Sequence, residues 1–161
     1  MIDIYLGLPY MHDSPTIMDI RADVSDLVAR DLSNSGKKVY APISSWHRIA
    51  TKYGMRQDWE FWQELDEEFI RCSKEVHFIT LPGWQDSTGV NAETCLANNL
   101  SKPIEYIDPT MYLYQLVEVY DTDPDLSSGD KALRLKFVEF MIQSVGKRKL
   151  STMGTYRELE D

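Results

Sequence analysis

The stretch IDIYLGLPY, residues 2–10, decides the fold expected for this chain. Its first residues are apolar and rich in strand formers, and they end at Gly7 and Pro9, which is typical of a buried strand that opens into a loop. A Ser-Pro pair at residues 14–15 then indicates a helix start, and apolar residues recur at helical spacing until Gly36. A strand, a loop and a helix in this order predict the first unit of an α/β protein.

The same alternation continues through the middle of the chain. Short strands are expected within residues 37–42, at 76–81 and at 104–107, and a helix is expected over residues 58–72. Residues 43–57 show no clear period, so we expect a loop there of the size found at active sites. The pattern predicts a Rossmann-like, flavodoxin-like parallel sheet of about four to five strands flanked by helices, with ligands bound beyond the carboxyl ends of the strands.

The pattern changes after Asp108. An apolar segment reaches Tyr120, and it is followed by a linker, an amphipathic helix at residues 131–145 and a polar tail that we expect to be mobile. We therefore expect one domain over residues 1–120. Residues 121–161 form a C-terminal helical extension that packs on this domain or exchanges with a neighbouring copy.

Composition and charge limit the classes of function. The chain has 161 residues, of which 43% are hydrophobic and 27% are charged, which is typical of one folded globular domain. Its formal net charge is -9, and its Lys and Arg residues form no long cluster, so a nucleic-acid polymer is not expected as a partner. A single nucleotide is still compatible, because backbone N–H groups at a helix N-terminus can hold one phosphate.

The cysteines and the N-terminus indicate a cytoplasmic protein. Cys72 and Cys95 fall within expected helices and lack CxxC spacing, so we expect buried, reduced side chains rather than a disulfide or a zinc site. The first ten residues carry neither a basic segment nor a long apolar run, so no signal peptide or membrane anchor is expected. No cluster has the sequence spacing of a metal site, and we expect neither a metal nor a cofactor.

The stretch DSTGVNAETCLA, residues 86–97, carries the most information about chemistry. It follows an expected strand and a glycine-containing loop, and it is expected to place Glu93 in the first turn of a helix. The helix dipole there favours an ionised carboxylate, and the loop N–H groups can bind a second anion. From spacing alone, an acidic residue that merely decorates a helix N-terminus is the alternative.

Three stretches together resemble the motifs of the nucleoside 2-deoxyribosyltransferase superfamily. They are IYLGLPY (residues 4–10), ELDEEFIRCSKEVHFITL (residues 64–81) and STGVNAE (residues 87–93). The similarity is closest to an uncharacterised phage and bacterial branch, which shares PIS at residues 42–44 and DWEFW at residues 58–62. Each motif is short, so the resemblance rests on the set, and it covers roughly residues 1–109.

The resemblance implies a catalytic trio. In the superfamily, the glutamate matched by Glu93 attacks C1′ of the deoxyribose, and the tyrosine matched by Tyr5 holds that glutamate in place. The aspartate matched by Asp66 handles the base or its proton. Cleavage of a glycosidic bond requires one ionised carboxylate at the anomeric carbon and one acid near the leaving group. Without the resemblance, Asp66 would be interpreted as one charge on a solvated helix and Tyr5 as part of the core.

Two positions depart from the transferases. Ser87 stands six residues before Glu93, at a position where the transferases carry an aspartate. The branch that hydrolyses deoxynucleoside 5′-monophosphates carries a serine at this position. Serine removes a negative charge and supplies a hydroxyl donor, which suits a 5′-phosphate. Lys74 stands where relatives often carry an aspartate, and we interpret that position as structural.

The expected substrate contacts lie in the loops that follow the strands. They are Gly7, Leu8, Pro9, His47, Ser87, Gly89 and Asn91. Glycines 7 and 89 either allow a close approach of substrate or simply form turns. His47 either faces the site or is an ordinary loop histidine. Trp46 and Trp84 are expected near the mouth of the site, whereas the helical spacing of Trp62 predicts a core residue.

The function expected from these features is hydrolysis of the N-glycosidic bond of a 2′-deoxynucleoside 5′-monophosphate. The first alternative is a 2-deoxyribosyltransferase, in which a second base rather than water opens the same intermediate. The second alternative is a catalytically silent nucleotide-binding protein that senses or sequesters its ligand. Because relatives assemble with a neighbour at the pocket, a homodimer or a larger homo-oligomer is expected.

Overall fold

The computed structural model describes residues 1–157, with side chains described through residue 149. It divides into two compact units, the first covering Met1–Asp108 and the second beginning at Pro109. The predicted α/β class is confirmed, and all of its strands lie in the first unit. Within the described residues, no helix is both long enough and apolar enough to cross a membrane.

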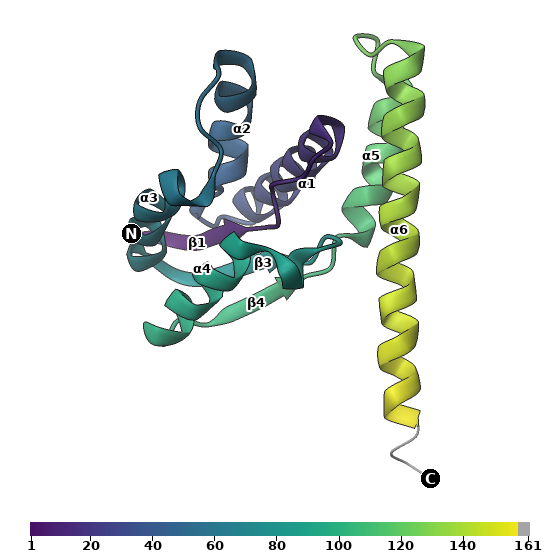
Figure 1. The fold of residues 1–161 in the computed structure, drawn as a ribbon. Helices are drawn as coiled ribbons and strands as arrows, with labels where there is room; N and C mark the ends of the chain where they lie inside the picture. The colour runs from purple at the N-terminus through teal and green to yellow at the C-terminus, as the bar shows by residue number, and fades with distance from the viewer. Residues whose placement is uncertain (158–161) are drawn as a thin grey trace. The chain divides into compact units, whose positions relative to one another are not determined.

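The first unit alternates strands and helices (Figure 1). Its elements are β1 (Ile2–Gly7), α1 (Pro15–Asn34), β2 (Val39–Tyr40), α2 (Pro42–Tyr53), α3 (Trp59–Cys72), β3 (Ser73–Ile79), the short 3-10 helix η1 (Trp84–Asp86), α4 (Thr88–Asn99) and β4 (Ile104–Ile107). The four strands form one parallel sheet in the order β2-β1-β3-β4. This order confirms the Rossmann-like sheet predicted from the sequence.

The register of the strands assigns side chains to the two faces of the sheet. Tyr5 of β1 is paired with Val76 of β3, whereas the next residue, Leu6, is paired with His77. Since successive side chains point to opposite faces, Tyr5 and His77 lie on different faces. On the Tyr5 face, Val76 packs with Ile70 of α3 and with residues of α4 in one buried cluster. This packing holds α3 and α4 against the strand that carries Tyr5.

The expected loop at residues 43–57 is wrong in its first part, because helix α2 runs from Pro42 to Tyr53. Proline at the first helical position and Gly54 in the left-handed conformation, with φ 76°, begin and end this helix. Few of its side chains are buried, and several of them line the cavity described below. The lining residues Ile43, Trp46, His47 and Ala50 recur at helical spacing, so the helical period was present in the sequence.

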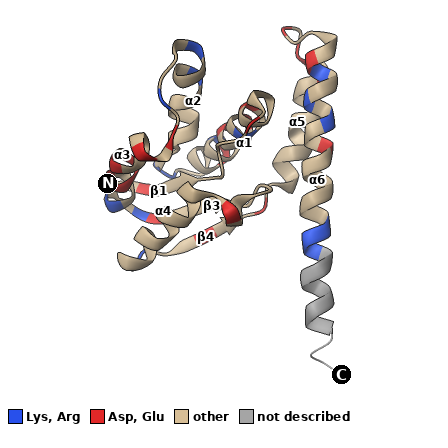
Figure 2. Ribbon diagram, in the orientation of Figure 1, with Lys and Arg blue, Asp and Glu red and all other residues tan. Residues whose placement is uncertain are grey.

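The expectation that both cysteines are buried is also wrong. Cys72 and Cys95 are free and exposed, at the end of α3 and on the outer side of α4 respectively. Charged residues of both signs are interspersed along the first unit (Figure 2).

The second unit consists of α5 (Thr110–Thr122) and α6 (Ser128–Arg157), which pack against each other. The apolar segment that ends at Tyr120 forms α5, so it belongs to this unit and not to the first domain, where it was expected. The amphipathic helix expected at residues 131–145 is the middle of α6, which continues to Arg157 through most of the expected tail. The last residues of that tail, 158–161, lie outside the described residues.

Candidate functional site

The carboxyl ends of β1 and β3 adjoin a cavity of about 570 Å³. This volume lies within the range of small-molecule sites, about 300–1,000 Å³. The lining comes from the loops after β1 and β3 and from helices α1, α2, α3 and α4. The cavity therefore lies where a parallel α/β sheet is expected to bind a ligand.

Two members of the predicted trio, Asp66 and Glu93, line this cavity, and Tyr5 contacts Glu93 but does not belong to the lining. The Tyr5 hydroxyl donates a hydrogen bond of 2.8 Å to Oε1 of Glu93, and Tyr5 itself is fully buried. Asp66 and Glu93 both line the cavity, with exposed fractions of 6% and 7%. Oδ1 of Asp66 and Oε2 of Glu93 are buried without a hydrogen-bond partner among the described residues. Two buried carboxyl groups with one unpartnered oxygen each are unusual, and they indicate a place for a polar ligand.

Gly7 places Glu93. A Cβ atom added at Gly7 would lie 2.7 Å from Oε2 of Glu93 and 2.7 Å from a ring carbon of Phe78. The last residue of β1 therefore has no room for a side chain, because the carboxyl group occupies that space. The sequence predicted either a close approach of substrate or a turn at Gly7, and the structure shows a close approach of the Glu93 carboxyl group.

Burial controls the protonation of the two carboxyl groups. It raises the pKa of Asp66 to about 7, and the Tyr5 hydroxyl opposes this shift. It also raises the pKa of Glu93 to about 8, where the charge of Asp66 adds to the effect and the Tyr5 hydrogen bond opposes it. The charge of one group disfavours ionisation of the other, so the two buried acids titrate as a pair that tends to retain a proton near neutral pH. Such a pair can supply one acid and one carboxylate to a reaction.

The position of Glu93 in α4 leaves burial as the main influence on its pKa. The helix begins at Thr88, so Glu93 lies in the second turn, and its expected place in the first turn is wrong. The helix dipole acts mainly within the first turn, so it contributes little to ionisation of Glu93, and burial dominates. The first-turn residues Thr88 and Gly89 line the cavity instead, which leaves the N-terminus of α4 for an anion.

Two polar lining residues, Ser87 at that N-terminus and Arg21 beside the loop after β3, are here called the polar pole of the cavity. Ser87 is the N-cap of α4 and accepts a bond of 3.4 Å from the Val90 N–H, so its own hydroxyl hydrogen remains for another partner. Arg21 of α1 is buried and donates to the carbonyls of Tyr10, Met11 and Pro82. Its Nε has no hydrogen-bond partner among the described residues.

Arg21 brings positive charge to the cavity. Burial lowers its pKa to about 10, which leaves the guanidinium charged at neutral pH. Among the described lining residues it is the one lysine or arginine. Sequence analysis missed Arg21, because a single cation in an amphipathic helix is indistinguishable from a surface residue. Its helical spacing with the buried residues Ile17 and Val24 of α1 is the one signal that could have revealed it.

His47 lines the cavity, as predicted, but both of its ring nitrogens are engaged. Nδ1 pairs with the Tyr10 hydroxyl at 2.8 Å, and Nε2 lies 3.0 Å from Oδ1 of Asp19. The imidazole therefore links α2 to the loop after β1 and to α1. In this arrangement His47 connects elements that form the wall of the cavity.

Tryptophan side chains form an apolar part of the wall. Trp46, Trp59 and Trp62 line the cavity, and the rings of Trp46 and Trp62 have centroids 5.4 Å apart. The expected core position of Trp62 is therefore wrong, since helical spacing does not distinguish a core from a cavity wall. Trp84 packs on Tyr106 and is not among the lining residues.

The remaining predicted contacts divide into two groups. Leu8, Pro9 and Gly89 line the cavity. Asn91 does not belong to the lining, and its side-chain amide donates to the carbonyl of Gln85 at 3.0 Å. Asn91 therefore holds the loop before α4 instead of facing the cavity.

Comparison with protein-family models places this unit in one family. Residues 2–108 match the model described as a domain of unknown function, DUF1937. No curated protein matches the chain. The matched range coincides with the first unit and includes every residue of the cavity described above. Because the match spans well over half of the 161 residues, the chain belongs to the DUF1937 family.

Proposed function

We propose that this protein hydrolyses the N-glycosidic bond of a 2′-deoxynucleoside 5′-monophosphate and releases the free base. The observation that carries the proposal is the pair of buried carboxyl groups, Asp66 and Glu93, which both line one cavity and each have one oxygen without a partner among the described residues. An oxocarbenium-like transition state requires this combination of an acid and a carboxylate. The resemblance of the three motifs to nucleoside 2-deoxyribosyltransferases supports the same assignment.

In the first step, an oxygen of the Glu93 carboxylate bonds to C1′ as the bond from C1′ to the base nitrogen breaks. Asp66 gives its proton to the departing base and becomes a carboxylate. The hydrogen bond from Tyr5 keeps Oε1 of Glu93 in place, so that Oε2, which has no partner, is the oxygen that attacks. The first step therefore requires the proton that the pair retains to rest on Asp66.

In the second step, water attacks C1′ and the bond between C1′ and Glu93 breaks. The Asp66 carboxylate accepts a proton from that water, and 2-deoxyribose 5-phosphate leaves. Both carboxyl groups then return to their starting states, and no other reactant is consumed. If a free base occupies the place of this water, the same intermediate yields a new nucleotide, which is the transferase alternative.

Recognition of the 5′-phosphate is assigned to the polar pole. The Ser87 hydroxyl and the N-terminus of α4 provide neutral donors, and Arg21 provides positive charge. The tryptophans on the wall, Trp46 and Trp62, supply flat apolar surface for the base. With the phosphate at the polar pole and the base against the tryptophans, C1′ is directed toward the carboxyl groups of Asp66 and Glu93.

One observation favours a second candidate function, a nucleotide-binding protein without turnover. Burial raises the pKa of Glu93 to about 8, so in the empty site the proton rests mainly on the residue that should attack. A protein that keeps this carboxyl group neutral would bind an anionic nucleotide with little repulsion. Binding measured by calorimetry without release of base would support this candidate.

The test is a screen in which the protein is incubated with deoxynucleoside monophosphates between about pH 6 and pH 9. Chromatography then measures the free base that is released. Glu93→Gln should lower the rate at least about 10³-fold, or about 4 kcal/mol of transition-state stabilisation. Glu64→Gln, an exposed position on α3, is the matched control and should keep the wild-type rate. Exchange of a labelled free base into nucleotide would assign the transferase alternative.

We also propose self-association of the chain. Support comes from large apolar side chains that are exposed on α5 and α6, among them Tyr114 and Phe140, the latter 62% exposed. Light scattering should give a mass of at least two chains for the wild type, and Phe140→Glu should shift the mass toward one chain. A wild-type monomer at micromolar concentration would contradict the proposal.

A further inference from the structure

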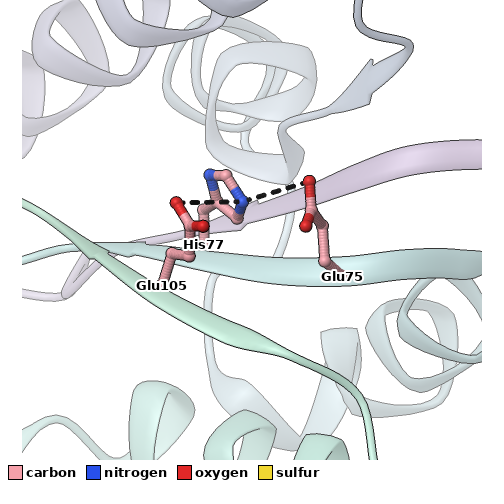
Figure 3. A group of neighbouring side chains, drawn as sticks. All are labelled: Glu75, His77 and Glu105. Carbon is pink, nitrogen blue, oxygen red and sulfur yellow. Dashed lines mark ion pairs between the residues drawn. The ribbon is translucent and has the colours of Figure 1, made fainter.

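Glu75, His77 and Glu105 form a cluster on the sheet face opposite to Tyr5 (Figure 3). Glu75 and His77 are two residues apart on β3, so their side chains point to the same face. Glu105 of β4 is paired directly with His77. The three side chains come together from two neighbouring strands, and none of them belongs to the lining of the cavity.

The distances within the cluster suit a shared ligand. Nε2 of His77 lies 3.4 Å from Oε1 of Glu75 and 3.8 Å from Oε2 of Glu105. One nitrogen or oxygen from each residue lies within 4.8 Å of the other two. Figure 3 shows the imidazole between the two carboxylates, with Nε2 the common point of the two contacts.

The state of His77 is a second and independent observation. The residue is 6% exposed, and neither ring nitrogen makes a hydrogen bond to a described residue. Buried polar groups nearly always have a partner, so a buried imidazole without one points to a ligand that completes it. Glu75 is partly exposed and Glu105 is exposed, so a cation and water can reach this group from solvent.

We propose that Glu75, His77 and Glu105 bind one divalent transition-metal cation, with Zn²⁺ as the best fit. Two carboxylates balance the charge of the dication, and a neutral imidazole nitrogen selects zinc-like ions over Mg²⁺ and Ca²⁺, which prefer oxygen ligands. Water completes the set of four ligands that zinc commonly takes. This site is independent of the proposed glycosidase function.

The geometry requires only a small closure. Ligand atoms that lie about 2.1 Å from a tetrahedral zinc are about 3.4 Å from each other, which the pair formed by His77 and Glu75 already matches. Glu105 has to move closer, and its side chain is 65% exposed and free to rotate. Lys37 lies at the edge of the group, with Nζ 4.0 Å from Oε1 of Glu75, and its exposed side chain can turn away.

The test follows the three histidine side chains of the chain by nuclear magnetic resonance during a Zn²⁺ titration. The full chain carries Cys72→Ser and Cys95→Ser, because both exposed thiols would otherwise compete for zinc. We expect the ring resonances of His77 to shift and to saturate at one equivalent of Zn²⁺. The resonances of His12 and His47 should stay unchanged, and Mg²⁺ at the same concentration should shift none of the three.

Two variants locate the site. His77→Asn and Glu105→Gln should each weaken Zn²⁺ binding by at least roughly 10- to 100-fold. Loss of a residue that only hydrogen-bonds to a metal ligand already has an effect of that size. Glu105 is exposed, so its variant should fold even if a substitution at the buried His77 does not. His12→Asn, at an exposed histidine of the loop after β1, is the matched control and should bind as the parent does.

Three outcomes would overturn the proposal. They are Zn²⁺ binding that leaves the His77 resonances unchanged, equal affinity in the parent and in Glu105→Gln, and equal responses to Zn²⁺ and Mg²⁺. If the His77 resonances shift only when the pH is lowered, and not with Zn²⁺, the cluster is an ion pair of a protonated imidazole with two glutamates.

Discussion

The two faces of the sheet carry similar groups in opposite surroundings. On one face, the carboxyl groups of Asp66 and Glu93 are buried beside the Tyr5 hydroxyl and adjoin a cavity. On the other face, the carboxyl groups of Glu75 and Glu105 reach solvent and it is the imidazole of His77 that is buried. One sheet therefore has a pair of buried acids from α3 and α4 against one face, and on the other face the proposed metal ligands from β3 and β4.

This difference shows that burial, more than residue type, decides what a pair of carboxyl groups can do. Where both groups are withdrawn from water, the neutral form is favoured and the pKa rises, as it does for Asp66 and Glu93. Where carboxylates remain in contact with solvent, they can meet a cation at little desolvation cost. Changes to single features of the face that carries Asp66 and Glu93 test whether burial has this effect.

The largest effect is expected from Asp66→Asn, which removes the proposed acid. Base release from natural nucleotides should fall about 10²–10⁴-fold, because the base must then leave without a proton. Substrates with a nitrophenyl-type leaving group need no proton, so their rate should change little if they are accepted. Steady-state rates on both substrate types check this. Equal losses on both would mean that Asp66 positions the substrate.

Gly7→Ala tests the fit around Glu93. The added Cβ would meet Oε2 of Glu93 and the Phe78 ring at 2.7 Å, so the carboxyl group must shift. A shift of about 1 Å in a catalytic group costs roughly 10²-fold in rate, and overpacking costs about 1–3 kcal/mol of stability. Rates and urea unfolding measure the two effects. Gly89→Ala is the stability control, since its Cβ would meet Trp59 at 3.5 Å, an ordinary contact.

Ser87→Asp tests the polar pole. A carboxylate there would face the 5′-phosphate, so the KM for monophosphates should rise about tenfold or more, whereas the KM for unphosphorylated nucleosides should rise less. Ser87→Asn separates charge from helix capping, because Asp and Asn both cap helices well. The Asn variant should lose little. An equal loss for both substrate types in the Asp variant would remove Ser87 from the phosphate site.

The pH dependence of stability tests the acid pair without a substrate. The pKa values of Asp66 and Glu93 are raised from 3.8 and 4.5 to about 7 and about 8. The stabilising contribution of these groups is therefore complete below about pH 4 and is lost as the pH rises through about 8. Each unit of pKa difference corresponds to about 1.4 kcal/mol. Between the two ends of this pH range, the free energy of unfolding measured in urea should fall less for Glu93→Gln than for the wild type.

Much of the fold could be predicted from the sequence, because β1, α1, α3 and β4 each carry a strong local signal. The strand at Ile104–Ile107 and the helix that starts after Ser14 both lie where they were expected. Helix α2 was missed although its cavity-lining residues recur at helical spacing, because Gly54, which is the C-cap of the helix, was interpreted as part of a loop. Local periodicity identifies the apolar face of a helix, but it does not distinguish a face that packs in the core from one that lines a cavity.

The candidate site could be predicted only in part. Tyr5, Asp66 and Glu93 were found through the motif resemblance, and in the structure Asp66 and Glu93 line the cavity and Tyr5 contacts Glu93. The turn of α4 that carries Glu93 was predicted incorrectly, since the start of a helix depends on its cap at Ser87. The cluster at Glu75, His77 and Glu105 could not be predicted, because its members come from two strands whose pairing the sequence does not specify.

In the proposed mechanism, Glu93 forms a covalent bond to C1′ of the sugar. A 2-fluoro deoxyribonucleotide analogue slows the opening of such an intermediate, so protein quenched during turnover should retain it. Peptide mass spectrometry should find the fluorinated sugar phosphate on the peptide that contains Glu93, and Glu93→Gln should carry no label. Release of base without any labelled protein, or a label on another residue, would contradict the mechanism proposed for this site.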